Sequence, residues 1–163
     1  MKKDITSKFQ MQDCFVREVI LHKPVILEPP FELSTSYHGD IVYGLRVEDN
    51  SSRYAVISLS LRLMQGTDLE ADVSSNEIFS VRIFAQSGFI APVSYVDEKK
   101  FLEMVKTTGA ASMIPIMRAY VTGVLAICGI PSDIRIPNID VTALEWEITR
   151  FQNAPADGYT HER

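Results

Sequence analysis

The feature that most constrains the fold is the stretch GAASMIPIMRAYVTGVLAICGIPSD, which covers residues 109–133. Its only charge before the final aspartate is Arg118. Such a stretch has to be shielded from water, and three structures can do this: a membrane span, a helix buried within one domain, or a helix covered by a partner chain. Each of the three implies a different kind of protein.

A membrane span is the first alternative, and the stretch is long enough for one, since about 20 residues suffice. Arg118, however, would lie near the bilayer centre at a cost of about 3 kcal/mol. The stretch also contains Pro115 and many alanine, glycine, serine and threonine residues, in place of the leucine and phenylalanine typical of a span. We therefore expect no membrane insertion.

A helix that starts near Ser112, with Pro115 in its first turn, would be apolar around most of its circumference. One sheet can cover only one of its two apolar stripes, and small residues on the remaining side would allow another helix to approach. We expect this helix to lie between its own sheet and a second subunit; a monomer whose other helices cover it is the alternative. The stripes are Met113, Met117, Tyr120, Val124 and Ile127, and Ile114, Val121, Leu125 and Cys128.

The rest of the composition is typical of one soluble domain, with 46% hydrophobic and 23% charged residues among 163. The formal net charge of −5 disfavours a nucleic-acid partner, because binding phosphates requires a basic face. Cys14 and Cys128 form no CxxC pair, and the first residues lack the apolar core of a secretory signal. These features predict a single cytoplasmic domain over 1–163, with flexible termini at 1–8 and 153–163.

Four segments predict strands. The clearest is residues 53–64, RYAVISLSLRLM, where apolar residues alternate with serine and arginine. Such alternation is typical of an antiparallel sheet with one buried and one wet face. The other strands are expected at 9–21, 40–47 and 76–89. The residues expected to share a face are Phe15, Val19 and Leu21 in the first strand, Ile57, Leu59, Leu61 and Leu63 in the third, and Phe79, Val81 and Ile83 in the fourth.

Helices are expected after the strands. Residues 96–108 have helical spacing, the uncharged stretch follows, and residues 139–152 have an apolar stripe with Asp140 as a plausible N-cap. Strands first and helices later predict an α+β fold, a four-stranded antiparallel sheet with helices packed on one face.

The segment HKPVILEPPFELSTSYHGD, residues 22–40, contains three prolines and is therefore expected to be an extended connection. It also carries apolar side chains that a solvated loop does not need. Either the segment packs over its own sheet, or it offers a binding surface for apolar ligand segments. These side chains are Val25, Ile26, Leu27, Phe31 and Leu33.

The sequence offers no catalytic constellation. His22, His38 and His161 show no metal-ligand spacing with cysteines or carboxylates, and there is no glycine-rich phosphate loop, nucleophile elbow or HExxH. We expect no catalytic residue, no cofactor and no metal. A binding or assembly protein fits better than an enzyme or a small-molecule binder.

Three stretches, in order, resemble the SecB family of bacterial export chaperones. FQMQDCFVREVILHKP, residues 9–24, is similar to the family's first strand, which runs from Phe-Gln-x-Gln to a proline. IPIMRAYVTGVLAICG resembles the long family helix with a Phe-Pro-Tyr-Ala-Arg motif, of which Pro115 and Arg118 keep the proline and the arginine. IRIPNIDVTALEWE is similar to the entry to the family's final helix, where Pro137, Ala143 and Leu144 match.

The resemblance implies an ATP-independent holdase without a cofactor, which binds unfolded or precursor polypeptides in apolar grooves and hands them to the SecA motor of the Sec translocase. It implies a homotetramer built as a dimer of dimers. The apolar connection would be the crossover loop of the groove, with Val25, Ile26, Leu27, Phe31 and Leu33 as client-binding residues. Residues expected at the oligomer interface are Arg82, Phe84, Met117, Arg118, Tyr120 and Val124.

The sequence departs from the family where SecA binds. The family presents acidic side chains on its outer sheet face; Glu18 matches the first of them, and Val81 falls at a neighbouring apolar contact position. His22 and Ile83, however, stand where acidic residues are usual. Two alternatives to export therefore stay open: a scaffold with the SecB fold, and a solitary or toxin–antitoxin-associated chaperone without handover to SecA.

Overall fold

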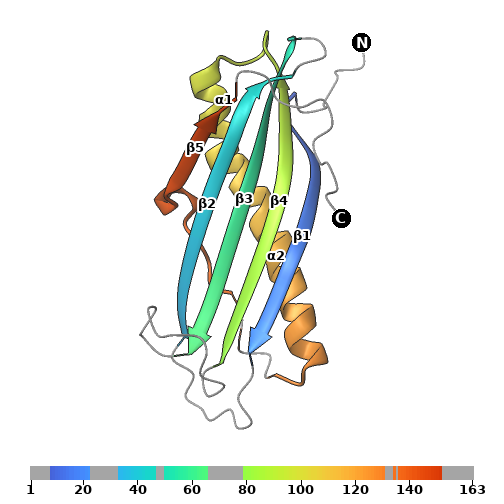
Figure 1. The fold of residues 1–163 in the computed structure, drawn as a ribbon, viewed down its shortest axis with the longest axis vertical. Helices are drawn as coiled ribbons and strands as arrows, with labels where there is room; N and C mark the ends of the chain where they lie inside the picture. Colours follow the sequence, from blue (N-terminus) through green and yellow to red (C-terminus); the bar gives the residue numbers. More distant parts are fainter. Residues whose placement is uncertain are drawn as a thin grey trace, which may run out of the picture.

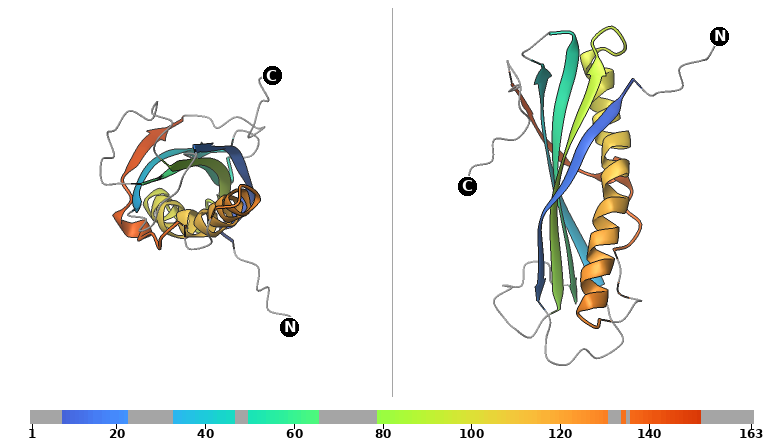
Figure 2. Two further views of the ribbon diagram at one scale, coloured as in Figure 1. Left: turned by 90° about the horizontal axis from the view of Figure 1, so that it is seen from below. Right: turned by 90° about the vertical axis from the view of Figure 1, so that its right-hand side faces the viewer.

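A computed structural model describes residues 8–22, 33–46, 50–65, 79–130, 134 and 136–151. Within these residues one long helix lies along one face of a five-stranded sheet, in the order β1-β4-β3-β2-β5 (Figure 1). Seen along the long axis of the molecule, the sheet curves around the helix (Figure 2). The strands are β1 (Gln10–His22), β2 (Leu33–Leu45), β3 (Ser52–Gln65), β4 (Ser80–Pro92) and β5 (Trp146–Arg150).

The fold is α+β, as the sequence predicts, but the sheet is mixed and has five strands instead of four. Strands β1 to β4 pair antiparallel, whereas β5 pairs parallel to β2, from Gly39 opposite Trp146 to Tyr43 opposite Arg150. The expected flexible termini lie outside the described residues, except for Lys8 and its exposed side chain.

The helix expected over 139–152 is wrong. A short 3-10 turn, η2 (Val141–Ala143), is followed by β5. Asp140 does cap the turn, because its carboxylate accepts a hydrogen bond from the Thr142 amide at 2.9 Å. Trp146 then packs across Gly39, where an added Cβ would lie 2.6 Å from the indole ring. Pairing with residues 39–43 of β2 therefore outweighs the local helical spacing of this segment.

Strand β2 is longer than expected, since it begins at Leu33 and not near Asp40. It stays in register with β3 from Leu33 opposite Gln65 to Leu45 opposite Arg53. Its first half is mostly polar and gives little strand signal of its own. The pairing with β3 recruits it, so residues 33–40 of the expected connection belong to a strand, and residues 23–32 lie outside the described residues.

Strand β1 has two register irregularities, one of them between Val16 and Glu18. A β-bulge reverses which residues point to the core, because the alternation has a period of two. Cys14 and Val16 before this bulge and Leu21 after it all pack against the core. Phe15, predicted to share a face with Leu21, is 43% exposed.

Strands β3 and β4 confirm the predicted alternation, and their inner residues form the centre of the core. The two helices expected at 96–108 and from Ser112 are one continuous helix, made of α1 (Glu98–Met104), the π-helical turn η1 (Val105–Gly109) and α2 (Ala110–Ile127). Pro115 lies inside α2 and not in a first turn. The buried residues are Ile57, Leu59, Leu61 and Leu63 of β3, Val81 and Ile83 of β4, and Phe79 directly before β4.

Candidate polypeptide-binding surface

Helix α2 covers the sheet with one face and leaves the other face open in the protomer. Tyr120 is 53% exposed and Ile127 is 87% exposed, and a Cβ added to Gly123 would have no described residue within 4 Å. Of the two predicted stripes, the one with Ile114, Val121 and Leu125 is buried along α2, whereas the other is divided between buried Met113 and Met117 and exposed Tyr120 and Ile127. The buried residues of α2 are Ala110, Met113, Ile114, Met117, Val121 and Leu125.

By length and composition the helix from Glu98 to Ile127 could cross a membrane. Its buried face, however, packs on a sheet that belongs to the same chain, with Met113, Met117 and Val121 in the common core. A core helix of a domain meets the same criterion, so the expectation of no membrane insertion remains a prediction.

Strand β2 has an edge that β5 covers only in part. Strand β5 pairs with residues 39–43 of β2, and residues 33–38 have no strand beside them on that edge among the described residues. Free main-chain N–H and C=O groups on a strand edge can bind an extended polypeptide by adding it to the sheet. This edge, called here the open β2 edge, directly follows the apolar connection in the sequence.

The predicted groove residues can be placed only in part. Leu33 is the first residue of β2, at the start of the open β2 edge. Val25, Ile26, Leu27 and Phe31 lie outside the described residues.

Arg118 holds the segment that leads to β5. Its Nη2 donates to the Pro137 carbonyl at 2.6 Å, while Ile134 and Ile136 on either side of residue 135 are buried in the core. The arginine of the motif thus has a partner inside the protomer. Its Nε is buried, with no hydrogen-bond partner in the described part of the chain.

The six residues expected at the oligomer interface do not share one surface. Arg82 and Phe84 point to the outer face of the sheet, whereas α2 packs on the inner face. Met117 is 0% exposed in the protomer, because its position on α2 points it into the sheet, and its expected contact with a partner stays a prediction. Tyr120, together with the half-buried Val124, remains available to a second subunit.

Of the residues expected to face SecA, the structure places only Glu18 on the outer face. Its carboxylate pairs with the Arg82 guanidinium at 3.1 Å. Val81 and Ile83 are buried against the helix, because successive residues of a strand point to opposite faces. Val81 therefore lies on the inner face of the sheet, and its expected contact with SecA stays a prediction.

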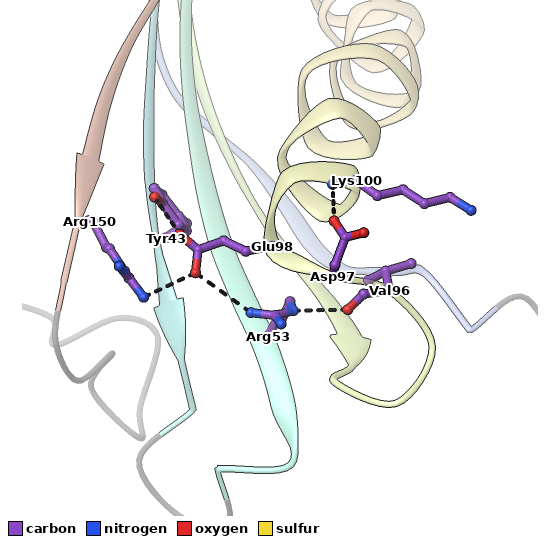
Figure 3. A network of polar contacts seen from close by, with 7 residues as sticks. All are labelled: Tyr43, Arg53, Val96, Asp97, Glu98, Lys100 and Arg150. Atoms are coloured by element: carbon purple, nitrogen blue, oxygen red, sulfur yellow. Dashed lines mark hydrogen bonds and ion pairs between the residues drawn. The ribbon is translucent and has the colours of Figure 1, made fainter.

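A polar network, which the sequence did not predict, joins four elements at one end of the molecule (Figure 3). The Glu98 carboxylate accepts hydrogen bonds from the Tyr43 hydroxyl at 3.1 Å and from the Arg150 guanidinium at 3.0 Å. Arg53 lies 3.9 Å from the same carboxylate and donates to the Val96 carbonyl. The network lines a hollow of about 440 Å³ and ties β5 to α1, β2 and β3.

Burial raises the pKa of the Tyr43 hydroxyl, and its hydrogen bond to Glu98 and the charge of Glu98 raise it further. The neutral phenol is therefore favoured in the folded protein, and its contribution to stability is present below pH 10 and lost as the pH rises through the raised pKa. Tyr43→Phe is expected to lower the free energy of unfolding by about 1–2 kcal/mol near pH 7. It should also weaken the loss of stability above pH 10, which urea unfolding at pH 7 to 11 measures; a loss identical to the wild type would contradict this role.

His38, Asp40 and Glu147 come within 4.8 Å of one another through one ligand atom each. The sequence search found no such group, because Glu147 reaches the two β2 residues only through the unpredicted strand β5. His38 and Asp40 already lie 3.4 Å apart as a pair, and all three are at least partly open to solvent. We assign no ion to this group.

No protein-family model and no curated protein matches this sequence. Among solved structures, the chain is similar to the SecB-like chaperone Rv1957 of Mycobacterium tuberculosis, in complex with a ChAD peptide from the Rv1956 HigA1 antitoxin. The two chains share 14% sequence identity with a TM-score of 0.53, and the match covers 81% of this chain and 91% of the other. At this identity the likeness concerns the fold, and the chain therefore has a SecB-like fold.

Proposed function

We propose that this protein is an ATP-independent holdase, which binds unfolded or precursor polypeptides and keeps them soluble. The observation that carries the proposal is the open β2 edge on a SecB-like fold, in direct continuation of an apolar connection. A client strand would pair with main-chain groups of residues 33–38, and this pairing is independent of the client's sequence. Apolar client side chains would contact Val25, Ile26, Leu27, Phe31 and Leu33.

We also propose that the protein self-associates. The outward face of α2 carries Tyr120 and Ile127 and a row of small residues, which would allow close approach of a helix from another subunit. We propose a homotetramer, a dimer of dimers, in which this face is covered. Tyr120 and Val124 would lie in its interface.

The route of the client is the finer part of the proposal. Cytoplasmic delivery to the Sec translocase would require SecA, and Glu18 is the acidic residue of the outer face that fits such contact. Glu18 is, however, already paired with Arg82. That pairing favours the second candidate, a solitary or toxin–antitoxin-associated chaperone, and the peptide bound to the similar mycobacterial protein points the same way.

Light scattering of a chemically unfolded client tests the holdase directly. The client is diluted out of denaturant with and without the purified protein, and the complex is then sized. We expect suppressed aggregation and a discrete complex with about four protein chains per client. If the protein assembles but the client still aggregates, the holdase proposal is refuted and the alternative of a scaffold with the SecB fold is favoured.

The groove assignment has its own test. The triple variant Ile26→Ser, Leu27→Ser, Phe31→Ser is expected to bind the client about tenfold more weakly or worse, because burial of each apolar side chain contributes about 1.5–3 kcal/mol. Phe15→Ser, a change of an aromatic residue on the outer face, is the matched control and should bind normally. Equal client affinity of the triple variant, measured by fluorescence anisotropy, would refute the groove assignment.

A further inference from the structure

The outer face of the sheet contains a hollow of about 240 Å³ on the side opposite the helix. Three neighbouring strands line it: β1 with Ile20 and His22, β3 with Arg62, and β4 with Ser80 and Arg82. Register explains why these residues meet, since His22 lies opposite Ser80, and Arg82 lies opposite both Ile20 and Arg62. We call this group the basic hollow.

The basic hollow has more positive than negative groups within the described residues. Arg62 and Arg82 are direct cross-strand partners, and like charges in that position repel. Arg82 has Glu18 as a partner at 3.1 Å. The Nη2 of Arg62 is buried and has no hydrogen-bond partner among the residues that the structure describes. A buried guanidinium nitrogen without an acceptor is unfavourable, so this arrangement needs a further acceptor.

The overall charge of the chain does not explain the cluster. With a formal net charge of −5 the protein is acidic, and yet two arginines and a histidine converge on one hollow. Ile20 forms an apolar part of the wall, which reduces the contact of the hollow with water and strengthens the electrostatic attraction of an anion.

We propose that the basic hollow is a binding site for one oxyanion, a phosphate or a carboxylate group. Guanidinium groups bind both anions through paired N–H donors, and an anion between Arg62 and Arg82 would offset their repulsion. The His22 ring and the Ser80 hydroxyl add donors from the adjacent strands. The volume exceeds that of several water molecules at about 30 Å³ each, so a tetrahedral anion fits.

The site lies on the face opposite α2, and it does not depend on the proposed holdase function. A carboxylate would come from an acidic segment of a partner polypeptide, whereas phosphate would be the free ion. Both anions would accept hydrogen bonds from the same donors. Only an acidic segment would attach a second polypeptide to the outer face of the sheet.

Calorimetric titration of the full-length protein with inorganic phosphate tests the site, in chloride buffer at fixed ionic strength. The variant Arg62→Met removes the donors and keeps the apolar stem. Lys99→Met removes the charge of an exposed side chain on α1, which lies at the opposite end of the molecule (Figure 1), and is the matched control. We expect about tenfold weaker phosphate binding for Arg62→Met and wild-type binding for Lys99→Met.

Thermal unfolding supplies a second readout. Without phosphate, Arg62→Met is expected to be at least as stable as the wild type, because it removes a buried unpartnered donor and a like-charge contact. With phosphate, the wild type is expected to unfold at a higher temperature than Arg62→Met. A purely structural arginine would give the same order in both buffers, and that outcome would overturn the proposal.

A competition experiment distinguishes the two sources. An acetylated, amidated tetraglutamate peptide that displaces phosphate from the wild type, with higher affinity than phosphate, identifies an acidic polypeptide as the ligand. A peptide that binds more weakly than phosphate identifies the free anion. Binding of neither probe, or equal phosphate binding by Arg62→Met, overturns the site. Arg62→Met should suppress client aggregation as well as the wild type does in the light-scattering assay. The anion site can therefore be tested independently of the holdase function.

Discussion

Met117→Ala is expected to lower the free energy of unfolding of the protein by about 2–5 kcal/mol. The side chain is fully buried between α2 and the sheet, in the same core as Met113 and Val121. Removing it leaves a cavity that the rigid sheet cannot fill by relaxing. Urea unfolding followed by far-ultraviolet circular dichroism measures this change.

Tyr120→Ser is the matched variant, since Tyr120 lies one turn further along α2 and is 53% exposed. It should leave the stability of the dissociated protomer nearly unchanged and shift the assembled protein toward smaller species in light scattering. If Met117→Ala dissociates the assembly without destabilising the protomer, Met117 is an interface residue after all. A tetramer unchanged by Tyr120→Ser would place the subunit interface elsewhere.

Gly39→Val is expected to detach β5 from the sheet. A Cβ at this position would lie 2.6 Å from two carbon atoms of the Trp146 ring, which is far closer than such atoms approach. Either the indole or the whole strand has to move, and overpacking of this kind costs about 1–3 kcal/mol. Because Trp146 is the single tryptophan, a red shift of the fluorescence emission would report its transfer to water.

Hydrogen exchange of the amides in Trp146–Arg150 should accelerate in the same variant, while β3 and β4 keep their protection. Gly123→Ala is the control: its new Cβ meets nothing within 4 Å, and alanine in a helix is favoured over glycine by about 1 kcal/mol. Wild-type emission and exchange for Gly39→Val would mean that the sheet accommodates the valine, and that the glycine is not what positions β5.

Some features follow from local patterns in the sequence. Strong alternation in β3 predicts its buried face correctly, because Leu59 and its neighbours repeat with the period of a strand. The apolar helix is equally recognisable. The face of β1 was predicted wrongly, because a bulge at Val16 changes the alternation without any mark in the residue types.

The candidate sites were predicted less well than the fold. Sequence patterns indicate an apolar surface in the connection that could bind clients. They do not reveal that β2 starts at Leu33, or that residues 33–38 have no strand beside them on one edge among the described residues. The network around Glu98 and the basic hollow around Arg62 each combine residues from several elements. Spacing along the chain carries no signal for such groups, since their members meet only when strands pair.

Local patterns in the residues alone predict a sheet with one apolar face and an apolar helix that packs on it. These properties are periodic, and a period can be recognised without knowing any contact. Three other features are visible only in the folded chain: residues 146–150 form a parallel strand, Met117 faces inward while Tyr120 faces outward, and Arg62 lies opposite Arg82. Each of these depends on a partner distant in the sequence, and the free energy of pairing with that partner outweighs the local preference.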